Sequence, residues 1–156
     1  MKKKQGIYIS CRWDTGGSIA RMIYDRLRLE KRCKCFMNVE KLLAEIFYKR
    51  IRQDMSMCDI FIPVLSRDAL FRCNIPNDKM RMEIAAAIEM GRAFMPVMSE
   101  DFTWPEEMPE EIKSIKDFNA IFYVQTYSEA VFHRLYSFIM TQRKEDERKR
   151  LVPIKF

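Results

Sequence analysis

The run DIFIPVLS, residues 59–66, is the most informative stretch of the chain for the fold. Almost every position in it is apolar, as in a strand of a parallel sheet that helices cover on both faces. Pro63 has no backbone N–H to donate to a neighbouring strand, so it marks a weak point near the end of this strand. The run therefore predicts a β-strand that is buried on both sides.

Further strand-like and helix-like patterns alternate on either side of this run. Short β-prone runs predict four more strands, at residues 7–10, 35–37, 93–98 and 120–124. Apolar residues at helical spacing predict helices with core positions at Ile19, Ile23 and Leu27; at Leu42, Leu43, Ile46, Phe47 and Ile51; at Met80, Ile84, Ala87 and Ile88; and at Val131, Leu135, Phe138 and Ile139. Shorter helical turns are expected in residues 67–74 and after Pro109, and Gly91 is expected to end the third helix in a left-handed conformation.

Alternating strands and helices with short connections predict the α/β class. We expect a flavodoxin-like three-layer fold, with a five-stranded parallel sheet in the order 2-1-3-4-5 and helices on both faces. In such a sheet a ligand binds beyond the carboxyl ends of the strands where the strand order reverses, here between the first and third strands. Residues 11–18, 38–47 and 66–78 are predicted to surround that point.

Length and composition favour one globular domain over residues 1–156, with tails at residues 1–5 and 149–156. No apolar run is long enough to span a bilayer, and the N-terminus leads into a strand rather than a signal peptide. We therefore expect a cytoplasmic protein with no membrane partner. Five cysteines, no CxxC pair and a single histidine, His133, argue against a disulfide framework, a zinc site and a histidine-dependent triad.

The formal net charge of +6 lies at the two ends of the chain. Lys2, Lys3 and Lys4 contribute three positive charges, and six basic and three acidic residues from 141 to 156 contribute three more. The remaining body has 19 basic and 19 acidic residues and is neutral. This distribution favours solvated tails, and we expect no nucleic-acid partner.

The segment NDKMRMEIAAAIEM, residues 77–90, places a carboxylate on the apolar face of a helix. Glu83 lies three residues after Met80 and four before Ala87, so it shares their face. A carboxylate at the margin of a packed face either finds partners or acquires a raised pKa, and such sites are enriched in function. The alternative is an ordinary ion pair with Lys79, four residues earlier on the helix.

Two other features leave a functional and a structural interpretation open. Gly16 and Gly17, predicted in a tight turn before a helix, would let backbone N–H groups approach a phosphate with help from Arg12, or they only shape the turn. Trp104 is either a site aromatic or an anchor for a proline-rich loop. The chain contains neither GxGxxG nor GxxxxGK[ST], so a dinucleotide-binding Rossmann site and a P-loop are not supported.

Six segments in order resemble the Toll/interleukin receptor (TIR) domains of the bacterial NAD-cleaving type. They are IYISCR with DTGGSIA from residue 7, FMNVEKL from residue 36, VLS with Ala69, Leu70 and Cys73, Glu83-Ile84 with Ala87, MPV with Phe102 and Trp104-Pro105, and Phe118-Asn119. The resemblance covers roughly residues 6–139. It implies the flavodoxin-like fold and an enzyme that cleaves the nicotinamide–ribose bond of NAD⁺ as substrate, with no metal and no further cofactor.

The same resemblance implies roles for particular residues. Glu83 would be the catalytic residue, which binds the ribose hydroxyls and stabilises the positive charge that develops as nicotinamide leaves. Expected substrate-binding residues are Ser10, Arg12, Trp13, Gly16, Gly17, Phe36, Glu40, Leu42, Phe47, Ser66 and Lys79. Self-association is expected through the BB loop, Val39 to Phe47, and a downstream effector would sense an ADP-ribose-derived product, linear, cyclic or conjugated, in bacterial defence against phage.

The alternative is a non-catalytic TIR module that acts through homotypic contacts of the BB loop. Three positions depart from the family pattern: Cys11 replaces an aromatic residue, Glu45 replaces a glycine, and Lys79 replaces a tryptophan. Glu45 restricts the backbone and adds negative charge near the substrate mouth. The altered loop therefore leaves three outcomes open: a stiffer gate, a different assembly contact, or lost activity.

Overall fold

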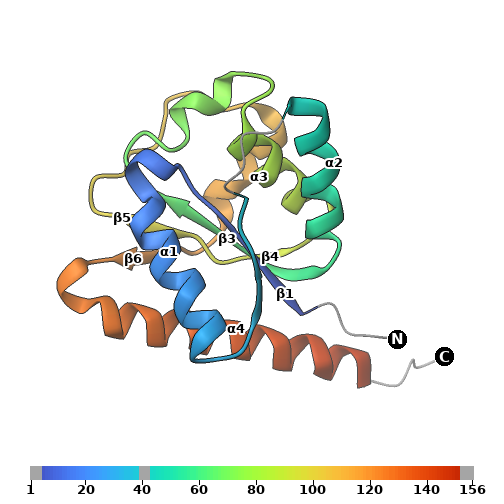
Figure 1. The fold of residues 1–156 in the computed structure, drawn as a ribbon, viewed down its shortest axis with the longest axis vertical. Coiled ribbons are helices and arrows are strands. Elements are labelled where there is room, and N and C mark those ends of the chain that lie inside the picture. Colours follow the sequence, from blue (N-terminus) through green and yellow to red (C-terminus); the bar gives the residue numbers. More distant parts are fainter. Residues whose placement is uncertain (1–4, 39–42, 152–156) are drawn as a thin grey trace.

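A parallel β-sheet forms the centre of the computed structural model, which describes residues 5–38 and 43–151 (Figure 1). Its strands are β1 Gly6–Ser10, β2 Lys34–Phe36, β3 Cys58–Leu65, β4 Ala93–Phe94, β5 Val97–Ser99 and β6 Ile121–Tyr123. They lie in the order β2-β1-β3-β5-β6, with β4 paired to β3, and every pairing is parallel. The predicted flavodoxin-like arrangement is confirmed, with β4 and β5 together in the place of the expected fourth strand.

The expected strand at residues 93–98 is divided because Pro96 interrupts it. β4 pairs with Ile60 and Phe61 of β3, and β5 pairs with Val64 and Leu65. Pro63 lies between these two pairings, where a missing N–H disturbs neither of them. The two prolines therefore fall at the same break in the sheet.

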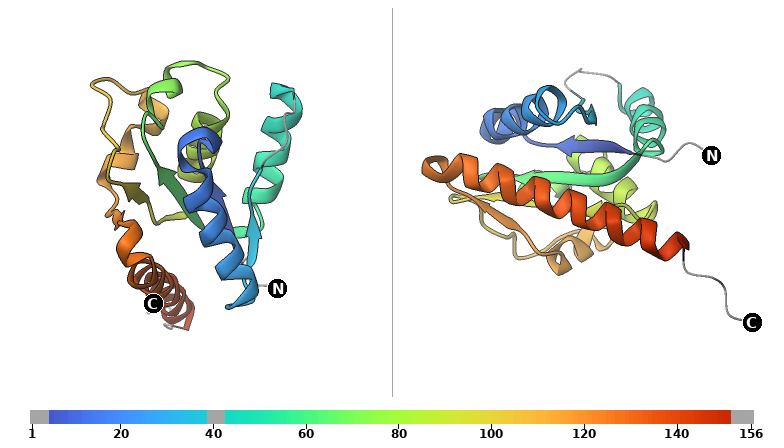
Figure 2. Two further views of the ribbon diagram at one scale, coloured as in Figure 1. Left: turned by 60° about the vertical axis from the view of Figure 1, so that its left-hand side comes forward. Right: turned by 90° about the horizontal axis from the view of Figure 1, so that it is seen from below.

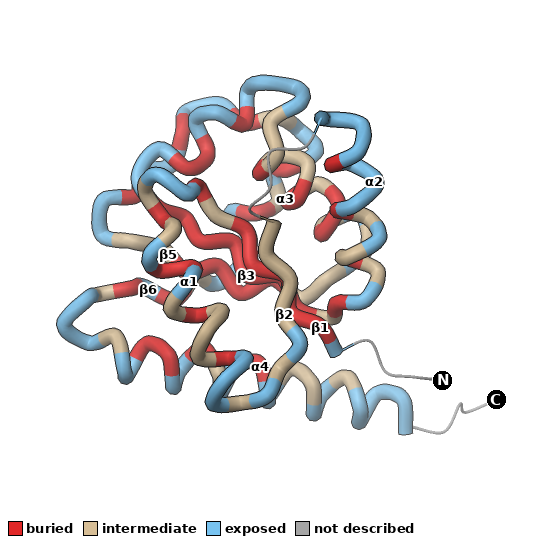
Figure 3. Tube along the Cα trace, viewed as in Figure 1, coloured by how far each residue is buried: buried red, intermediate tan, exposed pale blue. Residues whose placement is uncertain are grey.

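Helices cover both faces of the sheet, as predicted (Figures 1 and 2). The helices α1 Trp13–Leu29 and α4 Ser128–Leu151 share one core cluster, and α2 Ala44–Met55 and α3 Lys79–Glu89 share the other. Side chains alternate along β1, so Tyr8 packs toward α2 and α3, whereas Ile7 and Ile9 pack toward α1 and α4. Figure 3 shows buried residues concentrated along β1 and β3, which places the core around these two strands.

Three 3₁₀ helices connect the larger elements: η1 Phe71–Asn74, η2 Glu110–Asp117 and η3 Gln125–Tyr127. The first two confirm the short helical turns expected in residues 67–74 and after Pro109. Trp104 packs edge-on against Phe102, with ring centroids 5.0 Å apart, and the Lys116 ammonium lies 5.6 Å from its ring. These contacts fasten the loop after β5 and favour the structural interpretation of Trp104.

The predicted glycine turn is wrong, because α1 already begins at Trp13 and contains both glycines. The Gly16 N–H donates to the Arg12 carbonyl at 2.7 Å, which is a helical hydrogen bond. A Cβ atom at Gly16 would lie 2.8 Å from Ser66 Oγ. Glycine at this position therefore lets the first turn of α1 lie against the end of β3.

Two helical faces also differ from their predicted positions. Phe138 was expected in the core but is 42% exposed, whereas Phe132, earlier on the same helix, is fully buried. Leu43 caps the N-terminus of α2 instead of lying inside the helix, and Ile46 points outward. The face of α2 that does pack on the sheet carries Phe47 and Ile51, as the spacing predicts.

All five cysteines are free, and Cys58 and Cys73 are buried. His133 is exposed on α4, 3.8 Å from the carboxylate of Glu129, as expected for a histidine on a helix surface. Among the helices in residues 5–38 and 43–151, none is both long enough and apolar enough to cross a membrane.

Candidate active site

Glu83 lies in the middle of α3 with its side chain packed against the sheet. The helix begins at Asp78, whose carboxylate accepts a hydrogen bond from the Arg81 N–H at 3.0 Å, and it ends before Gly91, which has φ of +68°. The end at Gly91 follows the predicted signal. Because helical spacing places Glu83 on the same face as Met80 and Ala87, the residue is only 5% exposed.

Two hydroxyl groups of β1 satisfy this buried carboxyl group. Ser10 Oγ donates a hydrogen bond to Glu83 Oε1 at 2.9 Å, and the Tyr8 hydroxyl also hydrogen-bonds to Glu83. Tyr8 and Ser10 lie two residues apart on one strand, so both point toward α3. The Asn38 amide donates in turn to the Tyr8 oxygen at 2.6 Å. A chain of polar groups thus runs from the end of β2 to Glu83.

Burial controls the protonation of Glu83. Loss of solvent around the carboxylate raises the pKa of Glu83 to about 7, although the Tyr8 and Ser10 hydrogen bonds and the nearby Arg12 charge act in the opposite direction. The same burial, together with the charge of Glu83, raises the pKa of Tyr8 well above 10. Near neutral pH the site therefore holds a carboxyl group that readily exchanges a proton beside a hydroxyl group that stays protonated.

Arg12 lies beside this carboxyl group and is fixed by Asp78. Its guanidinium makes two charge-assisted hydrogen bonds to the Asp78 carboxylate, at 2.6 and 2.8 Å, and a third to the Ala69 carbonyl at 2.8 Å. Both side chains of the pair are nearly buried, at 8% and 10% exposed. In this structure Arg12 therefore joins the loop after β3 to the start of α3, and its guanidinium is already occupied.

The carboxyl ends of β1 and β3 contribute a second polar contact. Thr15 Oγ1 and Ser66 Oγ lie 2.8 Å apart, and Thr15 also donates to the Arg67 carbonyl at 3.0 Å. Trp13 is 43% exposed, and its ring covers Gly17, where an added Cβ would lie 3.0 Å from the indole. The Trp13 indole N–H reaches the Asn38 carbonyl at 3.4 Å, which joins the exits of β1 and β2.

The remaining expected site residues lie on the α2 and α3 side of the sheet or outside the described residues. Phe36 is in register with Tyr8, and its ring lies close to Gly6. Phe47 is buried in the core, and the Lys79 ammonium lies 4.8 Å from its ring. Glu40 and Leu42 lie outside the described residues. The two hydroxyl partners of Glu83 thus come from β1, across the helix–sheet contact.

Thiol chemistry is disfavoured near Glu83. Burial, followed by the charge of Glu83, raises the pKa of Cys11 to about 12, and burial likewise raises the pKa of Cys73 to about 12. A thiol with such a pKa is almost entirely protonated at neutral pH and is a poor nucleophile. These two thiols are therefore less suited to proton transfer at neutral pH than the carboxyl group of Glu83.

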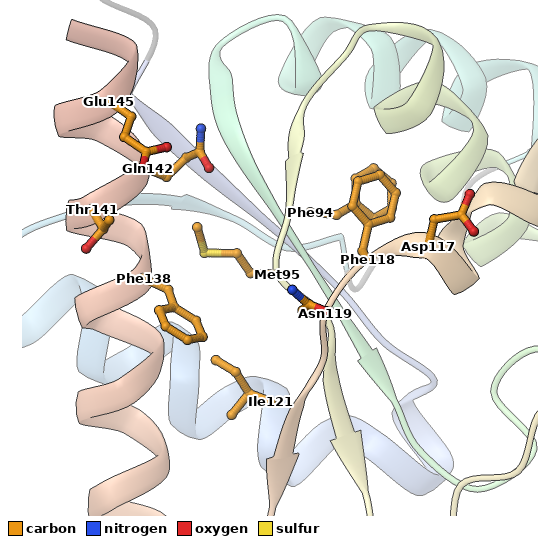
Figure 4. A pocket seen from close by; sticks show the side chains of 10 residues that line it. All are labelled: Phe94, Met95, Asp117, Phe118, Asn119, Ile121, Phe138, Thr141, Gln142 and Glu145. Atoms are coloured by element: carbon orange, nitrogen blue, oxygen red, sulfur yellow. The ribbon is translucent and has the colours of Figure 1, made fainter. Parts of the chain in front are cut away.

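A separate hollow of about 390 Å³ lies between α4 and the region of the sheet around β4 and β6 (Figure 4). Phe94 and Phe118 are among the residues that line it, and their rings stack with centroids 4.4 Å apart. Asp117 and Glu145 lie at opposite ends of the hollow in Figure 4, so its two acidic groups do not converge on one point. This hollow therefore lacks the concentrated polar chemistry seen around Glu83.

Sequence reasoning missed three residues that position Glu83 and Arg12: Tyr8, Asn38 and Asp78. Strand alternation could have identified Tyr8, because it lies two residues before Ser10 and must share its face. The pairing of Arg12 with Asp78 joins positions 66 residues apart and leaves no local signal in one sequence. Asn38 is likewise recognisable only once β1 and β2 are placed side by side.

Comparisons with known proteins agree with the fold and with the segments described above. A family model described as TIR domain matches residues 7–136. The chain is 19% identical to the TIR domain of the Toll-related receptor TRR-2 from Hydra magnipapillata, with a TM-score of 0.56 over 86% of this chain and 97% of that structure. At this identity the likeness concerns the fold alone.

Two curated relatives are similar over nearly the whole chain. One, the NAD(+) hydrolase sarm1 of Drosophila melanogaster, is 28% identical over 98% of this chain and 12% of its own length. The other, the NAD(+) hydrolase SARM1 of Danio rerio, is 30% identical over 94% of this chain and 22% of its own length. The chain thus spans less than a quarter of either relative.

Proposed function

The chain belongs to the TIR domain family, and from this premise we propose that it cleaves the bond between nicotinamide and ribose in NAD⁺. The observation that carries the proposal is the buried carboxyl group of Glu83, held at the carboxyl edge of β1 by Ser10 and Tyr8. The names of the two NAD(+) hydrolase relatives support the same activity.

The proposed reaction breaks the C–N bond between the ribose and the nicotinamide ring. The bonding electron pair leaves with nicotinamide, whose ring loses its positive charge, and positive charge develops on the ribose. Water then adds to the ribose and releases one proton, which gives ADP-ribose. A ribose-bound or external hydroxyl group in place of water would give a cyclic or conjugated product, and the three products remain alternatives within the proposal.

Glu83 would act in its ionised form. A carboxylate in a site with little water interacts strongly with the developing positive charge, because few solvent dipoles screen the two charges. A pKa of about 7 means that a substantial fraction of the molecules carries this carboxylate at neutral pH. Ser10 and Tyr8 would hold the carboxylate in place through the hydrogen bonds that they already make.

The substrate can reach Glu83 only after the site opens, because this side chain is 5% exposed in the present conformation. We propose that self-association provides the opening. Leu43 and Ile46 lie in the described part of the segment expected to form the BB loop and are 76% and 53% exposed, and Tyr48, directly after it, is 48% exposed. Apolar side chains exposed together in this way are typical of a protein contact surface.

One observation favours a second candidate function, a TIR module that only binds other TIR domains. The carboxyl group of Glu83 is buried and already has two hydroxyl partners, so it is fully satisfied without a substrate. In that case the exposed start of α2 would be the functional surface, and the polar chain around Glu83 would only stabilise the fold. The assay below separates these two functions.

Nicotinamide release from NAD⁺ by the purified protein tests the proposal, with Glu83→Gln as the key variant. We expect activity to rise more steeply than linearly with protein concentration and to fall by about 100-fold or more in Glu83→Gln, as when one electrostatic stabiliser of a transition state is removed. Glu89→Gln, an exposed change on the same helix, serves as the matched control and should keep full activity. Mass analysis of the second product then distinguishes ADP-ribose from cyclic and conjugated forms.

Equal rates in the wild type and Glu83→Gln would disprove the assigned role of Glu83. Absence of release at every concentration, with concentration-dependent association retained, would favour the binding module. The biological part of the proposal is that the product acts as a signal, sensed by a downstream effector, in bacterial defence against phage. Its test is whether phage infection raises the level of the product in cells that carry the wild type but not Glu83→Gln.

A further inference from the structure

A hollow of about 600 Å³ opens at the amino ends of the strands, at the end of β1 away from Ser10 and Glu83. The start of β1, the turn from α1 to β2, the turn from α2 to β3 and the middle of α4 contribute its walls. Figures 1 and 2 show α4 passing beside the start of β1, which closes one side of this region. The volume lies in the range of small-molecule sites.

The charged residues that line this hollow all have the same sign. Lys31, Arg32, Lys34 and Arg143 are basic, and the other lining residues carry no acidic group. Three of these cations come from one short run, residues 31–34, and the fold brings Arg143 of α4 to the same cavity. We give the name basic hollow to the cavity lined by these four residues.

Neighbouring negative charges cancel only part of this positive charge. Arg143 donates two hydrogen bonds to the Asp59 carboxylate, both at 3.0 Å, and is neutralised by it. Glu30 hydrogen-bonds to Arg26, which also binds Glu129, and the charge of Glu30 also acts on Lys31. The C-termini of α1 and α2 each add about half a negative charge nearby, so about one to two of the four positive charges remain.

Three cations of the basic hollow form no salt bridge with a carboxylate among the described residues. The Lys31 ammonium lies 4.6 Å from the Tyr136 ring, and the Lys34 ammonium lies 5.4 Å from the Phe36 ring. Arg32 is exposed and has φ of +54°, a left-handed conformation that favours glycine. The chain thus has an arginine where glycine would be less strained, and this arginine lines the hollow.

We propose that the basic hollow binds a small phosphorylated ligand that carries two or more negative charges. Lysine and arginine side chains converging on a recess suit phosphate oxygens, which accept several charge-assisted hydrogen bonds at once. The site is distinct from the proposed NAD⁺ site, because the five residues of β1 separate the two ends by about 13 Å. The proposal therefore stands whether or not the chain cleaves NAD⁺.

A recess favours a small ligand over a nucleic acid, whose backbone needs a groove or an extended basic face. The four cations surround one cavity and do not form a stripe along a helix or a sheet edge. Inorganic pyrophosphate is the simplest probe with the required charge. Isothermal titration calorimetry of the full chain with pyrophosphate at low and near-physiological salt therefore tests the proposal.

The decisive variant is the double substitution Arg32→Gly with Lys34→Gln. Glycine suits the left-handed backbone at position 32, and both side chains are exposed, so this variant is expected to fold. Pyrophosphate should bind the wild type with one equivalent per chain, more weakly at higher salt, and about tenfold or more less tightly in the double variant. Lys113→Gln, which removes one exposed positive charge from η2, should change binding less than twofold.

Three results would overturn the proposal: no pyrophosphate binding by the wild type at low salt, unchanged binding in the double variant, or equal weakening by Lys113→Gln. Binding of an RNA oligonucleotide without binding of pyrophosphate would also overturn it, because it would identify the basic residues as a nucleic-acid surface. Glu83→Gln should bind pyrophosphate like the wild type, which keeps this test separate from the test of NAD⁺ cleavage.

Discussion

The charged groups at the two ends of β1 differ in how far they are buried and in how they are paired. At the carboxyl end, Glu83 and the Arg12–Asp78 pair are nearly excluded from solvent, and each charged group is matched by designated hydrogen-bond partners. At the amino end, the basic hollow presents cations to solvent, and among the described residues only Arg143 of these four forms a salt bridge. One short strand thus connects a buried, satisfied polar site with an open, unsatisfied one.

This difference determines what each end can do and how strongly it resists substitution. A buried charge that loses its partner has no water to replace it, so substitutions at the carboxyl end should be severe and coupled to protonation. Exposed cations keep their hydration, so substitutions at the amino end should alter binding with little effect on the fold. The following predictions test this contrast from the largest expected effect to the smallest.

Loss of the buried ion pair should have the largest effect on stability. Arg12→Met leaves the Asp78 carboxylate, which is 10% exposed, without its bidentate partner and also removes the hydrogen bond to the Ala69 carbonyl. We expect the free energy of unfolding to fall by about 3–5 kcal/mol, as is typical when one member of a buried pair is removed. Urea denaturation followed by circular dichroism measures this change.

The matched control is the ion pair between Arg72 and Asp14, because both of its side chains are about half exposed. Arg72→Met should lower the free energy of unfolding by less than about 1 kcal/mol. If the two substitutions cost the same, then burial does not distinguish the carboxyl end from the surface, and the contrast drawn above is wrong.

Protonation of Glu83 should make stability depend on pH. The pKa of Glu83 is about 7 in the folded chain, above its ordinary value of 4.5, so the folded state holds this proton more tightly than the unfolded state. The resulting stabilisation is fully present below about pH 4.5 and is lost as the pH rises through 7. A pKa difference of this size corresponds to about 3 kcal/mol.

Glu83→Gln removes this titration while keeping an oxygen that can accept the Ser10 hydrogen bond. The difference in unfolding free energy between wild type and variant should therefore be constant below pH 4.5. Between pH 5 and 8 the wild type should lose stability relative to the variant. Chemical denaturation across this range gives the difference directly. A difference that does not change with pH would show that the carboxyl group of Glu83 is better solvated than its 5% exposure implies.

The two ends also differ in how much of them the sequence predicts. Glu83 could be identified from helical spacing, because a carboxylate between Met80 and Ala87 has to face the sheet. Its first partner, Ser10, was also an expected site residue, and alternation along the strand could have added Tyr8. These features follow from local periodicity within one element, which a single sequence records well.

Contacts between distant elements could not be predicted in the same way. Gly16 was expected in a turn because glycine is a poor helix former, but α1 needs a residue without a side chain where it approaches Ser66. The Arg12–Asp78 pair combines residues from separate segments, and the basic hollow adds Arg143 of α4 to the run of residues 31–34. Both become visible only when the order of the strands places these segments together.

The smallest predicted effect concerns Arg32, whose substitution should raise the free energy of unfolding instead of lowering it. Arg32→Gly should raise the free energy of unfolding by about 0.5–1 kcal/mol, because glycine adopts φ of +54° without the steric cost of a Cβ atom. Arg134→Gly, inside α4, should instead lower it by about 1 kcal/mol, since glycine is unfavourable within a helix. Thermal unfolding of the two variants under the same conditions compares them directly.

A loss of stability in Arg32→Gly would mean that the arginine side chain stabilises the turn from α1 to β2. A gain in stability together with weaker pyrophosphate binding would show that the strain at Arg32 is retained for binding, as expected of strained backbone at functional positions.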